Sequence, residues 1–257
     1  MRIHRTFLFL IASASFLLTS CEDDDESTMP TPEAQTCSLT KATEGQQITT
    51  LTYTNDKLSS FTIGTQTATI DYNTAGKPSK VTYSGSNDEI SYTYDAQGKL
   101  TFMNEAEQVE GGTSVLTTQY EYTNNQITKA SYSRTFRPTS GPSTIPLPRG
   151  YTAYTYDAKG NILTVKEYTS QNSLLSTTEK SDYDDRVNPG AVLESLLGPA
   201  SLNNPRTQVE KDENGNIVKE ASYTNAYTYN GSGYPTKVER TDQNGSKSQV
   251  TFDYSCK

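Results

Sequence analysis

Residues 154–163 read YTYDAKGNIL, the clearest copy of a unit that recurs along the chain. Tyr154 and Tyr156 are two residues apart, so both project from one face of an expected strand. Asp157 is a turn-opening residue whose carboxylate can accept a backbone N–H, and Gly160 supplies the positive φ that a short hairpin needs. The unit therefore predicts a β-hairpin, and its repetition predicts an architecture and not a reaction.

The copies of this unit drift in spacing. Close copies occupy residues 92–100 (YTYDAQGKL) and 227–234 (YTYNGSGY), and looser ones fill most of the chain from residue 37. The tyrosines at 72, 94, 122 and 156 are 22, 28 and 34 residues apart, whereas a strict solenoid keeps its period. Consecutive hairpins usually pair with their neighbours, and twist curls a long sheet. We expect an all-β domain over 37–257: a single curved antiparallel β-meander, as an open shell or half-barrel, with closure of the sheet as the alternative.

Two insertions interrupt the expected meander. Residues 137–150 contain four prolines and predict a loop of polyproline character. Residues 191–197 (AVLESLL) have apolar side chains on one side of a helical projection, and Gly198-Pro199 ends the segment. We expect one short helix there, packed on the sheet as core or covering a binding groove.

The N-terminus predicts export and lipidation. Residues 1–20 combine two arginines with an apolar run too short to span a bilayer, which is typical of a signal peptide. The run ends LTSC at Cys21, which resembles a bacterial lipobox and implies cleavage before a lipidated Cys21; an ordinary signal peptide is the alternative. The acidic stretch 22–26 belongs to an expected tether, 21–36, and resembles an export signal of surface lipoproteins. We therefore expect an outer-membrane protein facing the exterior, with the periplasmic face as the alternative.

Charge and histidine content narrow the functional classes. Without residues 1–20 the chain keeps 20 basic and 30 acidic residues, a net charge of −10. An acidic surface disfavours nucleic acid as a partner. The one histidine, His4, lies within the expected signal peptide. Catalysis and zinc binding that need histidine are thereby disfavoured, so we expect no enzyme activity and no cofactor.

The remaining cysteines bracket the expected domain. Cys37 opens it and Cys256 is the penultimate residue of the chain. An exported compartment is oxidising enough to keep a disulfide, which would close nearly the whole domain. Two unpaired thiols in edge strands are the alternative to a Cys37–Cys256 bridge.

Repeated acidic and aromatic side chains are the candidate sites. Asp95, Asp157 and Asp212 occupy equivalent turn positions, where turn capping explains each and calcium binding is disfavoured, so we expect no metal site. The tyrosines that would form cross-strand stripes either cover the sheet or provide a platform on which a sugar ring stacks. They are Tyr92, Tyr94, Tyr120, Tyr122, Tyr154, Tyr156, Tyr227 and Tyr229.

The repeat unit resembles the YD repeats of RHS-type proteins, which implies hairpins stacked into a β-shell. Residues 37–41 (CSLTK), 183–189 (YDDRVNP) and 203–205 (NNP), with the terminal cysteine, also resemble small surface lipoproteins of Bacteroidota. That resemblance implies a β-sheet domain on the cell surface and transfers no functional residue. We expect a non-enzymatic binding or scaffolding module, held in the outer membrane by its lipid, with a glycan or an envelope protein as partner. A glycan-binding accessory lipoprotein that uses exposed tyrosines is the alternative.

Overall fold

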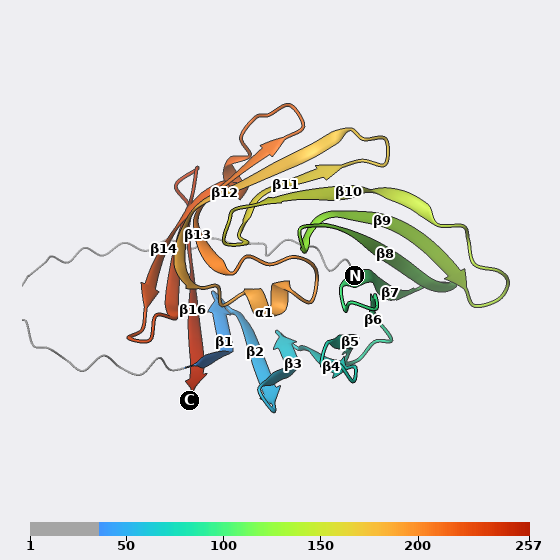
Figure 1. Cartoon of the computed structure of the whole chain (residues 1–257), viewed down its shortest axis with the longest axis horizontal. Helices are drawn as coiled ribbons and strands as arrows, with labels where there is room; N and C mark the ends of the chain where they lie inside the picture. Colours follow the sequence, from blue (N-terminus) through green and yellow to red (C-terminus); the bar gives the residue numbers. More distant parts are fainter. Residues whose placement is uncertain (1–35) are drawn as a thin grey trace, which may run out of the picture.

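The computed structural model describes residues 36–257; the expected signal peptide, the lipidated Cys21 and the tether up to residue 35 lie outside them. The described residues form sixteen strands that each pair antiparallel with their neighbours in sequence (Figure 1). The strands are β1 (Cys37–Glu44), β2 (Gln47–Thr54), β3 (Lys57–Ile63), β4 (Gln66–Tyr72), β5 (Pro78–Tyr83), β6 (Glu89–Tyr94), β7 (Leu100–Val109), β8 (Gly112–Thr123), β9 (Gln126–Pro138), β10 (Leu147–Tyr156), β11 (Ile162–Tyr168), β12 (Leu174–Val187), β13 (Asn203–Asp212), β14 (Tyr223–Tyr229), β15 (Pro235–Asp242) and β16 (Lys247–Cys256).

The expected open shell or half-barrel is wrong, because the sheet closes. Strand β1 pairs with β2 on one side and with β16 on the other, so the sheet is a closed barrel. The meander of hairpins follows from the repeats. Closure depends on whether twist and strand number bring the first strand against the last, and no repeat encodes that contact. Closure lets the first strand, β1, and the last strand, β16, pair their backbone groups with each other.

The repeated turn has the conformation that its sequence predicts. Asp157 Oδ1 accepts the backbone N–H groups of Lys159 at 2.9 Å and Asn161 at 2.8 Å, and Gly160 has a φ of +89°. These bonds lower the pKa of the Asp157 carboxyl, against the opposing effect of burial. The same pair of backbone bonds, to residues two and four positions on, is accepted by Asn73, Asp95, Thr169, Asp212, Asn230 and Asp242.

In the regular hairpins, alternating side chains give the wall a largely apolar inner face and a polar outer face. In β4, Ala68 and Ile70 are buried, whereas Thr69 and Asp71 between and after them are exposed. This period of two is that of a strand with one face packed and the other in water. The buried inner residues of many strands form one cluster that includes Leu39, Leu51, Val81, Ile90, Met103 and Ile162.

The insertion between β12 and β13 enters the barrel. Helix α1 (Ala191–Glu194) is shorter than the expected helix over 191–197, and single turns continue it to Gly198. Figure 1 draws α1 within the ring of strands, and Leu196 is part of the buried cluster. A 3-10 turn, η1 (Lys219–Ala221), precedes β14. Within residues 36–257, no helix has the length and apolar character needed to cross a membrane.

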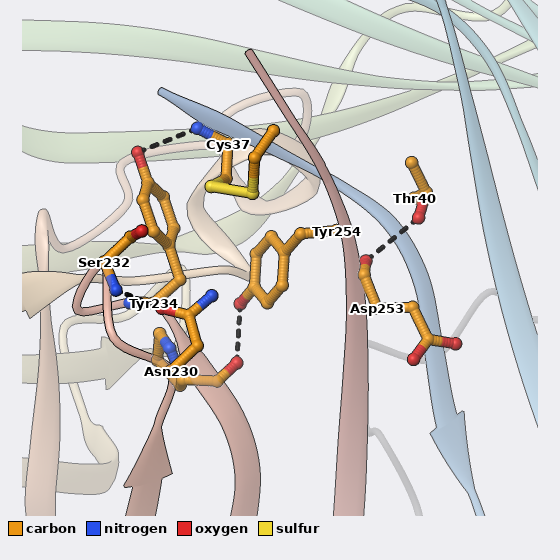
Figure 2. The surroundings of a disulfide bond; sticks show 9 residues. Cys37, Thr40, Asn230, Ser232, Tyr234, Asp253 and Tyr254 are labelled. Carbon is orange, nitrogen blue, oxygen red and sulfur yellow. Dashed lines mark hydrogen bonds between the residues drawn. A yellow bond between two sulfur atoms is a disulfide. The ribbon is translucent and has the colours of Figure 1, made fainter. Parts of the chain in front are cut away.

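A disulfide joins the two ends of the described chain, as the sequence predicts. Cys37 and Cys256 are opposite each other in the β1–β16 pair and are 219 residues apart in sequence. Figure 2 shows that the backbone N–H of Cys37 also donates to Tyr234 Oη, at 3.1 Å, beside the ring of Tyr254. The covalent link therefore lies at the strand pair that closes the barrel.

Candidate functional site in the barrel interior

A ladder of tyrosine hydroxyl groups links one hairpin to the next inside the barrel. Tyr94 Oη donates to the carbonyl of Pro78 at 2.7 Å, and Pro78 is the register partner of Tyr72 in the preceding hairpin. In the same way Tyr122 donates to Leu100, the register partner of Tyr94, at 2.9 Å. The ladder continues with Tyr72 to Leu58, Tyr156 to Ile127, Tyr183 to Ile162 and Tyr254 to Pro235, at 2.6–2.7 Å.

Lysines add a second contact to this ladder. Lys57, Lys77 and Lys99 each precede an acceptor residue of the ladder and place Nζ 5.3–5.4 Å from the centroid of the next tyrosine ring. Cation–π contacts of this kind contribute about 0.5–1 kcal/mol at exposed positions. Burial raises the pKa of Tyr156 to about 12, so its hydroxyl stays protonated and can donate. The repeated tyrosine and lysine thus join neighbouring hairpins.

The eight tyrosines of the predicted ligand platform belong to this interior. Tyr120 and Tyr154 are buried, and the other six are half-buried, facing the same inner side of the wall. Tyr92 Oη donates to the carbonyl of Leu196, at 2.8 Å, and so ties the insertion to the wall. The structure therefore brings the eight together as inner lining of the barrel.

The outer face carries a different pair of tyrosines, which the sequence analysis did not single out. Tyr151 and Tyr168 are register partners in β10 and β11, with ring centroids 4.6 Å apart and planes at 13°. Lys129 Nζ lies 5.0 Å from the Tyr151 centroid and forms an ion pair with Glu121 at 3.0 Å. Both tyrosine side chains are only half-buried, so part of each ring is exposed to solvent on the outer face.

The ladder is interrupted at β13 and β14. Pro205 is the register partner of Tyr183, so its carbonyl is the next expected acceptor. It accepts from Asn225 at 2.9 Å and from Tyr227 at 3.2 Å. Tyr229, the equivalent of Tyr156 in its hairpin, instead donates to the Asp184 carboxylate near the end of β12, just before the insertion. The regular pattern therefore fails where the insertion joins the wall.

The β13–β14 pair is also the least regular junction between neighbouring strands. Two register pairs join these strands, whereas twelve join β8 and β9. Side chains replace the missing backbone bonds: Gln208 Nε2 donates to the carbonyl of Ala221 at 3.2 Å, and Ser222 Oγ accepts the N–H of Glu210 at 2.9 Å. Side-chain bonds therefore supplement the few backbone bonds in this part of the wall.

Charged side chains face the interior beside this junction. Arg240 lies over the ring of Tyr223, with Cζ 3.8 Å from the centroid, and its Nε donates to Asn225 Oδ1 at 3.3 Å. Tyr223 in turn donates to Gln208 Oε1 at 2.8 Å. Six charged side chains belong to this part of the interior, and we call them the interior charged cluster. They are Glu44, Glu167, Lys180, Glu194, Glu210 and Arg240.

Burial dominates the ionisation of this cluster. It raises the pKa of Glu44 to about 7, against the opposing effect of Arg240, and it raises the pKa of Glu194 and Glu210. Burial lowers the pKa of Lys180, against the opposing attraction of Glu194. The Glu194 side chain is nevertheless solvent-exposed.

Comparison with known proteins places this architecture in a family. Residues 30–197 match the family model of the teneurin YD-shell. The chain belongs to this family. The predicted YD-repeat nature of the hairpins is thereby confirmed. A search among curated proteins found no match.

One solved structure supports the closed barrel, and two others are more distant matches. A porin-like protein from Bacteroides vulgatus is 16% identical, with 86% of this chain and 99% of that chain covered, at a TM-score of 0.54. That likeness shows the fold alone. A porin-like protein from Bacteroides uniformis matches 90% of this chain and 100% of its own at 13% identity, with a TM-score of 0.35. The Photorhabdus luminescens Tc holotoxin pore is 18% identical over 81% of this chain and 9% of its own, with a TM-score of 0.26.

The interior charged cluster of this YD-shell chain was not predicted from its sequence. One signal was visible: the hairpin over residues 209–217 keeps its turn but lacks both tyrosines of the repeat. Its inward positions instead include Glu210, next to the side-chain-held junction. A repeat copy that keeps the turn and loses its lining residues therefore marked the irregular part of the wall.

Proposed function

We propose that this YD-shell protein is a non-enzymatic, lipid-anchored module that binds or scaffolds other components at the outside of the cell envelope. The observation that carries the proposal is the closed wall: β1 and β16 pair with each other, a disulfide links them, and every strand has two neighbours. A barrel without free strand edges resists uncontrolled strand addition and offers a rigid, polar outer surface. The lipobox-like LTSC at Cys21 supplies the anchor.

Intact cells test both parts of this proposal. Wild-type protein is expected to incorporate radiolabelled palmitate, to be degraded by external protease and to form reproducible crosslinks to envelope components. Cys21→Ser is expected to lose the label and the membrane fraction while keeping its fold. Label retained in Cys21→Ser, protection from external protease, or no crosslinked partner would contradict the anchor, the orientation or the scaffolding role respectively.

The stacked Tyr151–Tyr168 pair favours a second candidate function, glycan binding. Tyrosine faces can stack on sugar rings, and this pair lies on the outer face, beside Lys129. A glycan array probed with the purified protein tests it. Tyr168→Ala is expected to abolish any binding, whereas Tyr94→Phe, a change within the interior ladder, is expected to preserve it. An array without signal contradicts this candidate.

A further inference from the structure

Basic residues gather in one sector of an otherwise acidic barrel. Of the 22 basic and 30 acidic residues of the chain, residues 122–166 hold six basic residues and one acidic residue, Asp157. Because each strand pairs with its neighbours in sequence, these residues also form a continuous sector of the wall, built from β9, β10 and β11 (Figure 1). The order of the strands therefore converts a local excess of positive charge in the sequence into a local excess in space.

Five of the six basic side chains belong to the outer surface of this sector. The exception is Arg134, which faces inward and donates to Ser114 Oγ at 2.6 Å. The other five are Lys129, Arg137, Arg149, Lys159 and Lys166. All of these except Lys129 are exposed, and their side chains form no hydrogen bond or ion pair within residues 36–257.

The acidic residues that border the sector do not offset these cations. Glu121 pairs with Lys129 at 3.0 Å, and Glu179 on β12 pairs with Lys211 at 2.7 Å. Glu167 is the register partner of the buried Thr152, so it projects to the inner side of the wall. An anionic partner on the outer face would therefore meet cations that no carboxylate of this chain neutralises.

Rows of outward side chains run across the sector from the outer Tyr151–Tyr168 stack. In the row next to the stack, Ala153 lies between its register partners Lys129 and Lys166. The row after that pairs Thr155 with Thr164, whose hydroxyl oxygens are 2.7 Å apart. At about 3.4 Å per residue these three rows extend about 14 Å along β10.

The stack leaves one aromatic face uncovered by its known contacts. One face of the Tyr151 ring lies against Tyr168, and Lys129 Nζ lies over the other, 5.0 Å from the centroid. The Tyr168 ring uses one face in the stack, and neither contact covers its second face. A sugar ring can stack on an exposed tyrosine face of this kind.

An open pocket of about 390 Å³ lies at the far end of these rows, between the β10–β11 turn and β12. Lys159 and Leu163 contribute to its wall. Its two carboxylates are engaged, because Asp157 accepts the N–H groups of the turn and Asp182 Oδ2 accepts from Thr207 Oγ1 at 2.9 Å. The pocket therefore adds a cation and an apolar side chain to the same outer face.

We propose that the outer face of β9–β11 binds an anionic polysaccharide, a chain of sugar rings that carry carboxylate or sulfate groups. A ring stacks on the uncovered face of Tyr168, and the anionic groups pair with Lys166, Arg149 and Lys159. Sugar hydroxyls bond to the Thr155–Thr164 row. This inference rests on the second candidate function, glycan binding, and names its class of ligand.

The combination of features selects this class. A neutral glycan would use the tyrosine face and the hydroxyls but would leave the cations without partners. An acidic peptide would pair with the cations but would make no use of a ring face placed beside them. Duplex nucleic acid would extend beyond the sector and meet the acidic remainder of the barrel, which repels it.

Biolayer interferometry of the full-length protein in detergent tests the proposal. The probes are polygalacturonate and dextran sulfate, each beside its uncharged form, methyl-esterified polygalacturonate or dextran. Saturable binding of at least one charged polymer is expected, about tenfold tighter than that of its uncharged form. Arg149→Gln with Lys166→Gln is expected to weaken this binding about fivefold, because two exposed ion pairs lose their cations. Tyr168→Ala is expected to weaken it as well.

The matched control removes two exposed cations from another part of the barrel. Lys219→Gln with Lys247→Gln is expected to bind within about twofold of wild type, and both double variants are expected to keep the wild-type Tm. Equal weakening by the two double variants, or no binding of either charged polymer, would overturn the proposal. Equal affinity for poly-L-glutamate or single-stranded poly-dT would assign the sector to polyanions in general and overturn it too.

One outcome separates this inference from the function on which it rests. Equal affinity for the charged and uncharged forms of a polymer would overturn the anionic ligand class and leave glycan binding standing. A glycan array without signal would remove both. None of these results bears on the surface crosslinks expected of the envelope module.

Discussion

Strand pairs β8–β9 and β13–β14 are built on different principles although they belong to one barrel. Twelve register pairs join β8 to β9, and Tyr156 of the next hairpin donates to the Ile127 carbonyl at the start of β9. Two register pairs join β13 to β14, and Asn225, Gln208 and Ser222 supply side-chain bonds instead. The β8–β9 pair has the regular pairing that the repeat predicts. The β13–β14 pair comes directly after the insertion and lacks that regular pairing.

This difference teaches where the repeat ceases to determine structure. The tyrosine ladder needs a tyrosine in each hairpin and an acceptor carbonyl in the preceding one. At the insertion the acceptor on Pro205 is taken by Asn225 and Tyr227, and Tyr229 turns to Asp184. The same displacement leaves interior positions for charged side chains.

The largest expected effect comes from the disulfide, which joins β1 to β16 where the barrel closes. Replacing Cys37 and Cys256 with serine removes a link between residues 219 apart. Loop entropy alone predicts a loss of about 5 kcal/mol in the free energy of unfolding. Urea unfolding measures this loss as the difference in the free energy of unfolding between the double variant and Cys21→Ser, in which Cys37 and Cys256 are unchanged.

A single transition in both proteins is expected, because one buried cluster spans the barrel. A loss below about 1 kcal/mol would show that the β1–β16 pair closes the barrel without the covalent link. Two separate transitions would show that the regular and the irregular parts of the wall unfold independently.

The sequence determines the local parts of this fold well. Asp157 with Gly160 predicts the turn, and the structure has the Asp157 bonds and the positive φ that it implies. Alternation predicts which strand residues share one face of the sheet. Cys37 and Cys256 predict the disulfide. Each of these features depends on a few residues close together or on a simple count.

The features that escaped prediction depend on contacts between distant segments. Closure requires β1 to meet β16, and no local pattern in either strand encodes the other. The interior charged cluster draws on distant strands: Arg240 of β15 affects the pKa of both Glu44 of β1 and Lys180 of β12. Whether the tyrosine stripes face inward or outward also depends on which face the closed sheet encloses.

The tyrosine ladder gives the next prediction. Tyr156→Phe removes the hydroxyl that donates to Ile127 at 2.6 Å and leaves that carbonyl without its donor. A loss of about 1–3 kcal/mol is expected, because an unsatisfied buried acceptor costs more than a lost surface bond. Tyr168→Phe on the outer face is the matched control and is expected to change stability by less than about 0.5 kcal/mol. Equal losses in the two variants would show that the ladder adds nothing beyond ring packing.

The smallest expected effect is a pH dependence that arises at the interior charged cluster. Burial raises the pKa of Glu44 from 4.5 to about 7, so the folded protein binds a proton that the unfolded chain releases at lower pH. The contribution of this group is therefore complete below about pH 4.5 and is lost as pH rises through 7. The Tm of wild type is expected to fall between pH 5 and pH 8 by more than the Tm of Glu44→Gln, because the glutamine side chain does not titrate. The Glu44 side chain is half-buried, so solvent screening weakens its contribution. We therefore expect this effect on stability to be smaller than those of the cysteine double variant and of Tyr156→Phe. A Tm difference between the two pH values that is the same in both proteins would assign the dependence to other groups.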